Sequence, residues 1–296
     1  DFCLSRGLGD VYKRQGISWV WMGLEGQNSS YAKLSGVKTR DLVKELQAHG
    51  IRVLGSTIIG LEEHTPDNIR DAIDYAVSHD TVFHQFMLYT PLPGTPLYEE
   101  HKAKHLLLDE KEMPVADIHG QYRFNYHHPH IAQGQETTFL QNAFSLDFMK
   151  NGPSLARMIR VMMDGWRLYK NHPDPCVRTR LENEIRPFRT TYAAAVFAMK
   201  MWFRKERTLY RKLKSILSDM YKEFGWKTRI IASTLGLIGC FTIWVEKKRL
   251  AQGWTYEPPT FYEKNARALE LERSIRVEER VRMSRKHLEL PRAAMF

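Results

Sequence analysis

The sequence has little cysteine, and its cysteines form no recognisable pattern. The 296 residues include three, Cys3, Cys176 and Cys240. They lie too far apart for a disulfide-stapled small domain or for the short spacing of a Cys-ligated zinc or iron–sulfur site. We therefore expect no metal ligands in this chain. His127, His128 and His130 are the residues of a less favoured metal site, and a polar linker is the preferred interpretation.

Several other signatures are missing. The chain has no internal repeat, no low-complexity tract, no signal-peptide layout, no phosphate-binding loop and no nucleophile–base constellation. An ordinary small α/β enzyme therefore has no support from any motif. A composition of 43% hydrophobic and 26% charged residues is that of a globular protein and excludes a disordered or fibrous chain.

The net charge of +10 is unevenly distributed. Residues 16–118 carry 9 basic and 15 acidic side chains, whereas residues 119–296 carry 32 basic and 17 acidic ones. This asymmetry predicts two functional units. We expect a β/α unit over residues 16–118, a linker with a first helix over 119–152, and a basic helical domain over 153–296.

Residues 1–15 form a separate case. Residues 5–15 read Ser-Arg-Gly-Leu-Gly-Asp-Val-Tyr-Lys-Arg-Gln and resemble the in-frame translation of a sequencing-library adapter. We expect this segment to be foreign to the protein, and the natural chain to extend upstream of Gly16. A native N-terminal arm is the less favoured alternative.

Strand-like and helix-like patterns alternate along the β/α unit. Apolar runs at residues 17–22, 51–59 and 83–89 predict strands, and helices are predicted to start at Thr39 and at Thr65-Pro66. The order β-α-β-α-β predicts parallel strands, and nearly continuous apolar runs favour a sheet buried on both faces. Ligands of such folds bind at the carboxyl ends of the strands.

The basic half is predicted to be helical. Helices are expected from Pro153 and over residues 188–222, 227–251 and 263–288. Residues 230–245 form a run of 16 residues without charge, flanked by Trp226, Lys227 and the basic triplet at 247–249. A buried core helix is the preferred interpretation, and a helix lying in a membrane interface is the alternative. Nucleic-acid binding is disfavoured, because acids are mixed with the bases and no recognition motif occurs.

Three motifs near the predicted strand ends occur in a familiar order. Residues 22–29 read Met-Gly-Leu-Glu-Gly-Gln-Asn-Ser, residues 58–65 read Ile-Ile-Gly-Leu-Glu-Glu-His-Thr, and residues 88–96 read Leu-Tyr-Thr-Pro-Leu-Pro-Gly-Thr-Pro. In spacing and order they resemble the last three strands of radical S-adenosylmethionine enzymes, especially the cobalamin-binding subgroup. The resemblance implies an α/β fold, the C-terminal half of a partial (β/α)6 radical SAM barrel, followed by a mostly α-helical domain.

The resemblance also implies that the cofactor-binding parts are divided between this chain and an upstream region. The family's Cys-x-x-x-Cys-x-x-Cys loop, which binds the 4Fe-4S cluster, and its cobalamin domain do not occur in this chain. Both would lie upstream of Gly16 in the intact parent. The chain would then supply part of the S-adenosylmethionine site for cobalamin-dependent methyl transfer or oxidoreductive chemistry. It would contribute no catalytic residue and no metal ligand, and we expect the fragment itself to be inactive.

The implied contacts to the adenine lie at two strand ends. Ile58 would give an apolar contact, Gly60 would allow close backbone approach, and backbone groups of Tyr89 and Thr90 would bind the adenine edge. From the residues alone, Ile58 as an ordinary core residue is equally favoured.

The implied contacts to the polar end of the cofactor are two charged residues. Glu25 would accept from the ribose hydroxyls or the methionine ammonium, and Lys38 would pair with the methionine carboxylate. A solvated Lys38 is an equal alternative. Glu63 is interpreted as an acid at a helix N-terminus and not as a ligand contact.

The expected partner is a small molecule. An uncharged run with basic flanks suits a lipid-like substrate and peripheral membrane contact through the helical tail, and hence a cytoplasmic, membrane-associated protein. A second hypothesis, of a different class, makes the helical tail a membrane- or partner-binding module on an α/β scaffold.

Overall fold

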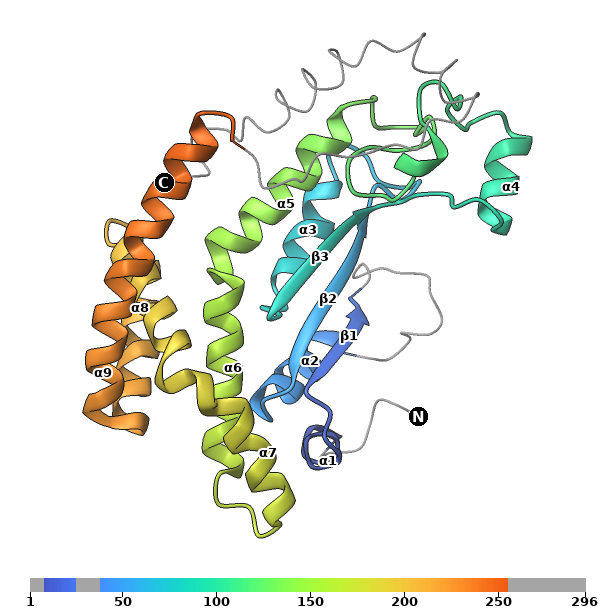
Figure 1. Ribbon diagram of the computed structural model, residues 1–296. Coiled ribbons are helices and arrows are strands. Elements are labelled where there is room, and N and C mark those ends of the chain that lie inside the picture. Colours follow the sequence, from blue (N-terminus) through green and yellow to red (C-terminus); the bar gives the residue numbers. More distant parts are fainter. Residues whose placement is uncertain (1–7, 25–37, 255–296) are drawn as a thin grey trace, which may run out of the picture.

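The computed structural model describes residues 8–24 and 38–254, which form an α/β unit followed by a group of helices (Figure 1). The strands are β1 (Trp19–Gly23), β2 (Arg52–Ile59) and β3 (Phe83–Leu88). The described helices are α1 (Leu8–Gln15), α2 (Thr39–Ala48), α3 (Ile69–Val77), α4 (Pro96–Ala103), α5 (Gln135–Asn151), α6 (Ser154–Tyr169), α7 (Pro175–Ile185), α8 (Thr191–Trp202) and α9 (Arg207–Ala251). Two short 3-10 turns, η2 (Val115–Asp117) and η3 (Arg186–Arg189), complete them.

The three strands form one parallel sheet in the order β1-β2-β3. Trp19 pairs with Arg52 across the first ladder, and Leu54 pairs with Phe83 across the second. The predicted β-α-β-α-β order is therefore confirmed, with parallel strands joined by crossover helices as in Rossmann-like folds. All three strands end at the same edge of the sheet, which we call the carboxyl edge.

Within the described ranges, one face of the sheet is covered by helices and most of the other face is open. Side chains alternate along β2 and β3, so that Val53, Ile59 and Phe86 are buried against helices α2, α3 and α5. Trp21 and Ile58 point to the opposite face and are exposed. The prediction of a sheet buried on both faces is therefore wrong for the described residues. Continuous apolar runs hide this difference, because apolar side chains occupy the open face as well.

Two predicted helix starts lie elsewhere. Lys38, and not Thr39, is the N-cap of α2, because the Thr39 hydroxyl contacts His79 Nε2 at 2.8 Å. Helix α3 starts at Ile69, four residues after Thr65. Thr65 and Asn68 instead hold the preceding turn by reciprocal side-chain bonds to each other's backbone N–H.

The C-terminal helices form their own core, which is rich in methionine, alanine and aromatic residues. Helix α6 starts next to Pro153 as predicted. The predicted helix over 188–222 is divided among η3, α8 and α9 by a turn at residues 203–206. Helix α7, which follows Asp174 as N-cap, was not predicted. The helix expected over 263–288 lies outside the described residues.

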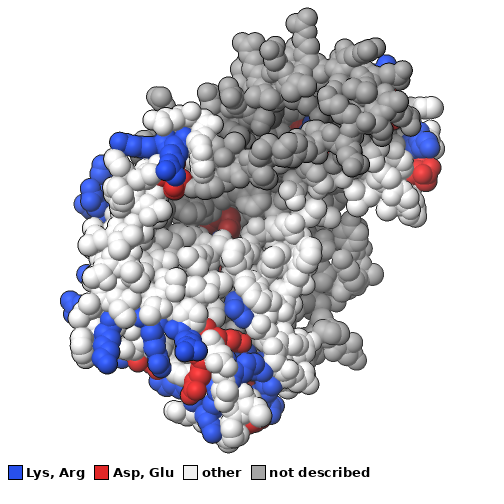
Figure 2. Space-filling view, viewed as in Figure 1, with Lys and Arg blue, Asp and Glu red and all other residues white. Residues whose placement is uncertain are grey.

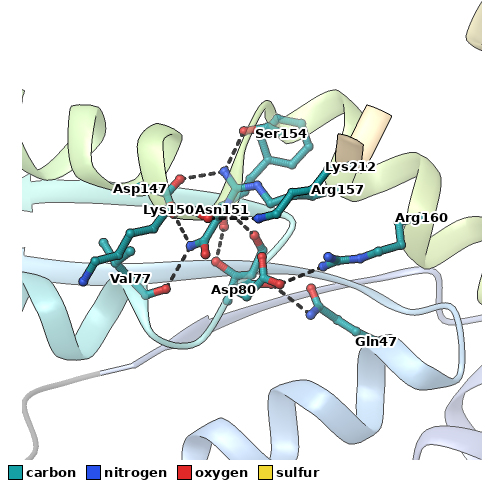
Figure 3. A network of polar contacts seen from close by, with 12 residues as sticks. Gln47, Val77, Asp80, Asp147, Lys150, Asn151, Ser154, Arg157, Arg160 and Lys212 are labelled. Carbon is teal, nitrogen blue, oxygen red and sulfur yellow. Dashed lines mark hydrogen bonds and ion pairs between the residues drawn. The ribbon is translucent and has the colours of Figure 1, made fainter. Parts of the chain in front are cut away.

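A buried ion pair joins the helices to the sheet (Figure 3). Arg157 of α6 makes a bidentate contact with Asp147 of α5, at 3.0 and 2.6 Å, and both side chains are buried. The same guanidinium donates to the carbonyl of Thr81, just before β3, at 2.8 Å. Asn151 donates to Asp147 and to the carbonyl of Val77 at the end of α3. The α5–α6 corner is thereby fixed to the amino end of β3.

A second junction needs two glycines. A Cβ atom on Gly50 would lie 2.5 Å from the Cα of Gly165, and a Cβ on Gly165 would lie 2.7 Å from Gly50. Gly50 also has a φ of 75° as the chain leaves α2. The turn after α2 and the middle of α6 therefore meet backbone to backbone, which only glycine permits.

Residues 8–15, which we predict to be foreign to the protein, form α1. The buried Lys13 lies 3.1 Å from Glu184 of α7, and burial lowers the pKa of its ammonium group. The foreign origin of this segment stays a prediction, as do the four predicted domain ranges.

We predict that Arg157→Met lowers the free energy of unfolding by about 3–5 kcal/mol, because Asp147 stays buried without its counter-charge. Urea unfolding measures the loss. Arg160→Met is the control: Arg160 lies 2.9 Å from Asp80, but each of these side chains is 40% exposed. That variant should lose no more than about 1 kcal/mol. Equal losses in the two variants would contradict the assigned role of Arg157.

We also predict that protonation of His84 lowers the free energy of unfolding in acid. Its ring is buried, stacks on Phe86 with centroids 4.0 Å apart, and contacts the Thr57 hydroxyl at 3.0 Å. Burial lowers the pKa of His84 to about 4, whereas the unfolded chain protonates near its ordinary value of 6.5. The stabilisation that the neutral His84 ring gives the fold is therefore complete above pH 6.5. About 3 kcal/mol of it is lost as the pH falls toward 4.

The measurement compares urea unfolding at pH 7 and pH 4 for the parent chain, His84→Gln and His130→Gln. The parent chain and the variant at the exposed His130 should lose about 3 kcal/mol more than His84→Gln does. The same pH dependence in all three proteins would show that His84 does not cause the loss of stability in acid.

Candidate functional site

The carboxyl edge brings together segments that are distant in sequence. The N–H of Leu24 donates to the carbonyl of Ser56 at 2.9 Å, and the N–H of Tyr89 donates to the carbonyl of Ile59 at 2.9 Å. Gly60 and Tyr89 therefore leave neighbouring strands side by side. This is the edge at which parallel α/β folds bind their ligands.

An irregular, aromatic segment covers part of this edge. We call residues 119–131 the edge segment. The N–H of Leu88 donates to the carbonyl of Gly120 at 2.7 Å, and the Tyr126 hydroxyl donates to the carbonyl of Gly60 at 3.3 Å. His128 contacts the carbonyl of Leu61 through Nε2 at 3.0 Å. The edge segment is thus fixed by backbone groups of β3 and of the turn after β2.

Two histidines in this region act as hydrogen-bond acceptors. Nδ1 of His64 accepts from the N–H groups of Gly60 and Leu61, at 3.0 and 3.2 Å. Nδ1 of His128 accepts from the N–H of Ile131 at 3.1 Å. Burial lowers the pKa of both His64 and His128, and it raises the pKa of Tyr126. The turn is therefore held by neutral rings at neutral pH, because a protonated Nδ1 could not accept these bonds.

Gly60 has the left-handed backbone, φ 77°, that its predicted role requires. The space beside it is already occupied, because a Cβ on Gly60 would lie 2.3 Å from the ring of Phe124. The close approach that Gly60 permits is therefore made by an aromatic side chain of the edge segment. A ligand at this edge would have to lie on the other side of the turn, over the open face of the sheet.

A small cavity of about 200 Å³ lies under the edge segment. It is lined by Phe124, Tyr126, His127, His128 and Glu136, among others. Glu136 is buried; its Oε2 accepts from the N–H of Gly134 at 2.6 Å, and its Oε1 has no hydrogen-bond partner. The cavity is smaller than typical cofactor sites, so the group it could hold is a small hydrogen-bond donor and not a nucleoside.

The structure places the six predicted cofactor contacts in three groups. Gly60, Tyr89 and Thr90 lie together at the carboxyl edge. Ile58 is exposed on the open face of the sheet, one residue before the end of β2, opposite Met87 in the ladder. Lys38 is exposed at the start of α2, and Glu25 lies outside the described residues.

The backbone of Tyr89 is partly engaged already. Its N–H donates to Ile59, and its ring packs edge-on against His101 and Tyr126. The Thr90 hydroxyl donates to the carbonyl of Leu88 at 2.9 Å. Any adenine contact by this segment would therefore not use the Tyr89 N–H. The predicted roles of all six residues stay predictions.

The sequence interpretation missed the residues that build this edge. Phe124, Tyr126 and His128 fall in the predicted linker, and the sequence gives His64 no role of its own. The signal for their role was the density of histidine and aromatic residues between 119 and 130. In the described ranges, no group of three or more His, Cys, Asp or Glu side chains could hold a metal ion.

Comparison with known proteins finds two partial relatives. The chain is 33% identical over 101 residues to an uncharacterized methyltransferase of Pyrococcus horikoshii, across 32% of this chain and 22% of that protein. It is 26% identical over 110 residues to the bacteriochlorophyllide d C-12(1)-methyltransferase of Chlorobaculum tepidum, across 35% of this chain and 24% of that protein. No family model matches. The chain spans less than a quarter of either relative.

These findings correct the family prediction. Both relatives are named methyltransferases, and no radical SAM family model matches the chain. The prediction of a radical SAM fragment, with its iron–sulfur cluster and cobalamin, is therefore wrong on these comparisons. The three strand-end motifs are short and rich in glycine and proline, and such residues recur wherever parallel strands turn. A helical binding module as the main function gains no support either.

We predict that Gly60→Ala destabilises the chain more than Gly94→Ala does. Both glycines have a φ near 80°, so each alanine costs about 1–2 kcal/mol of backbone strain. Only at Gly60 would the new methyl group also displace Phe124, which adds about 1–3 kcal/mol, whereas nothing lies within 4 Å at Gly94. Urea unfolding measures both. A Gly60→Ala loss no larger than that of Gly94→Ala would show that Phe124 does not close over the turn.

Proposed function

We propose that the chain is part of an S-adenosylmethionine-dependent methyltransferase. The observation that carries the proposal is the pair of relatives named as methyltransferases, each matched over about a third of this chain. The parallel sheet also has an exposed apolar face next to its carboxyl edge. This is where parallel α/β folds bind nucleoside cofactors. When bound, S-adenosylmethionine supplies an activated methyl group that passes from its sulfonium to a nucleophilic atom of the acceptor.

The cofactor is proposed to lie over the open face of the sheet at its carboxyl end. Ile58 would contact the adenine there, because its side chain is exposed on that face near the end of β2. Backbone groups of Tyr89 and Thr90 would bind the adenine edge. The Phe124 ring would support the Gly60 turn from the covered side and not touch the cofactor.

The polar end of the cofactor is assigned to charged residues outside the strands. Lys38 would pair with the methionine carboxylate from the start of α2, and Glu25 would accept from the ribose hydroxyls or the methionine ammonium. An exposed Lys38 agrees with this role, because it can turn toward an anion without breaking a buried contact.

We further propose that the three strands belong to a larger sheet in the whole protein. The apolar open face supports this, because both faces of a parallel sheet are ordinarily covered, and further strands that curve the sheet can close over the open one. In that arrangement residues 16–118 are the β/α unit, residues 119–152 are the linker and first helix, and residues 153–296 form the basic helical domain, whose α6 packs against the unit.

The proposed methyl acceptor is a small molecule with a lipid-like, hydrophobic body. The exposed apolar surface of the C-terminal helices supports this, since it suits a cytoplasmic protein working at the periphery of a membrane, where such molecules gather.

We predict saturable binding of S-adenosylmethionine to the full chain, measured by equilibrium dialysis with methyl-labelled cofactor. Ile58→Asp should weaken the affinity about 10- to 100-fold, because it removes an apolar contact and adds a charge. Phe83→Asp is the matched control, since Ile58 is 38% exposed and Phe83 is 37% exposed on the same face, at its opposite end. No saturable binding, or equal weakening by both variants, would reject this site.

A further inference from the structure

The outer part of α9 has an apolar face that nothing in the described structure covers. By length and composition α9 could cross a membrane: its most apolar 18-residue window has a mean hydropathy of 1.5, and only 17% of that window is buried. The exposed side chains include Ile230, Leu237, Ile238, Phe241 and Trp244. The preferred prediction of a buried core helix over residues 230–245 is therefore wrong.

Gly225 divides α9 into two arms. Its φ of 82° and ψ of −172° interrupt the helix, so residues 207–224 form a first arm and residues 226–251 an outer arm. The first arm contributes Leu213, Leu217 and Met220 to the helical core. The outer arm adds Ala232 to the same core and turns its large side chains away from it.

The outer arm meets α8 through small residues. A Cβ on Gly236 would lie 2.7 Å from the Phe197 ring and 2.9 Å from the carbonyl of Ala194, and Gly239 approaches Ala198. Thr228 and Ala232 are buried on the same side. This close contact fixes the rotation of the arm. The opposite face of a helix on a water-exposed surface is normally charged, but here it is apolar.

Both ends of the apolar face carry tryptophan beside basic side chains. Lys227 lies over the Trp226 ring with its Nζ 5.9 Å from the centroid, and Lys248 lies over Trp244 at 3.8 Å. Arg249 lies over Trp254 at 5.6 Å. Tryptophan and lysine are the residues that gather at the boundary between lipid headgroups and hydrocarbon. In Figure 2 uncharged surface on this side of the molecule is bordered by basic side chains above and below.

A cavity of about 550 Å³ opens onto the same face, between the end of α8 and the outer arm. Its walls are apolar and include Trp202, Phe203 and Phe241, while three basic residues and one acid also line it: Arg204, Lys205, Lys247 and Glu206. Apolar walls beside basic groups match a molecule with a hydrocarbon part and an anionic head.

From these observations we infer that the outer arm of α9 docks on the surface of a bilayer that contains anionic phospholipid. The arm lies in the interface with its apolar face toward the acyl chains. It does not span the bilayer, because its uncharged run, residues 230–245, is 16 residues long whereas a span needs about 20, and because one side of the arm is packed against α8. The inference rests on this surface alone and not on the proposed methyl transfer.

Co-flotation of the full chain with vesicles tests the docking. Vesicles of phosphatidylcholine with phosphatidylglycerol should carry the protein, phosphatidylcholine alone should carry it much less, and added salt should weaken the anionic binding. Equal binding to both vesicles would overturn the role of anionic lipid. Binding that survives extraction at high pH would show a spanning helix and overturn the interfacial orientation. No binding to either vesicle would reject the inference.

A variant and its control test whether the apolar face of the outer arm makes the contact with the vesicle. The double substitution Ile238→Ser and Phe241→Ser should weaken vesicle binding about a hundredfold, because two side chains lose their burial in lipid. The matched control is Leu168→Ser with Met149→Ser, on α6 and α5, where Leu168 is 55% exposed compared with 62% for Ile238. Unchanged flotation of the first variant, or equal loss in both, would place the contact elsewhere and favour a protein partner for the apolar face.

A charge variant keeps the test valid if the apolar variant fails to fold. Lys227→Gln with Lys248→Gln alters only exposed ends and should weaken binding to anionic vesicles about thirtyfold. Circular dichroism confirms that each variant is folded, and no cofactor is present in the assay. Failure here therefore rejects the docking surface and leaves the proposed methyltransferase function unaffected.

Discussion

The buried guanidinium of Arg157 connects the two halves of the molecule. It satisfies Asp147 of α5 and a carbonyl next to β3 at once, so the α5–α6 corner cannot move without leaving a buried charge unpaired. This joint lies at the amino end of β3. The carboxyl edge, at the other end of the strands, is therefore left to the turn after β2 and to the edge segment, whose Tyr126 and His128 side chains bond to carbonyls of that turn.

Local sequence patterns predicted the sheet but not its surroundings. The three strands and two crossovers follow from short apolar runs and from helical periodicity, and both signals are local. The open face could not be predicted this way, because Trp21 and Ile58 are as apolar as the buried Val53 and Phe86. The division of residues 188–222 among three elements was missed for a related reason. The alanine-rich α8 and the start of α9 both have helix-forming compositions, so no local signal marks the turn between them.

The candidate site shows a similar division. Gly60, Tyr89 and Thr90 were named through the resemblance of the strand-end motifs, and the parallel topology brings them to one edge. What closes over that edge depends on contacts between residues more than 60 positions apart, such as Tyr126 with Gly60 and His128 with Leu61. Neither short motifs nor periodicity report such contacts. The wrong family prediction has the same cause, because the three short motifs describe turns, whereas a family is defined by the whole chain.

Two apolar surfaces remain uncovered in the described structure, and their charge surroundings distinguish them. The open face of the sheet belongs to the segment with 9 basic and 15 acidic residues, whereas the outer arm of α9 belongs to the segment with 32 basic and 17 acidic ones. An anionic bilayer attracts the second and repels the first. The acidic unit would then face the aqueous phase, where an uncharged or cationic ligand can reach the carboxyl edge without competing with lipid. In the docking that we propose, the charge asymmetry of the chain would therefore orient it on the bilayer.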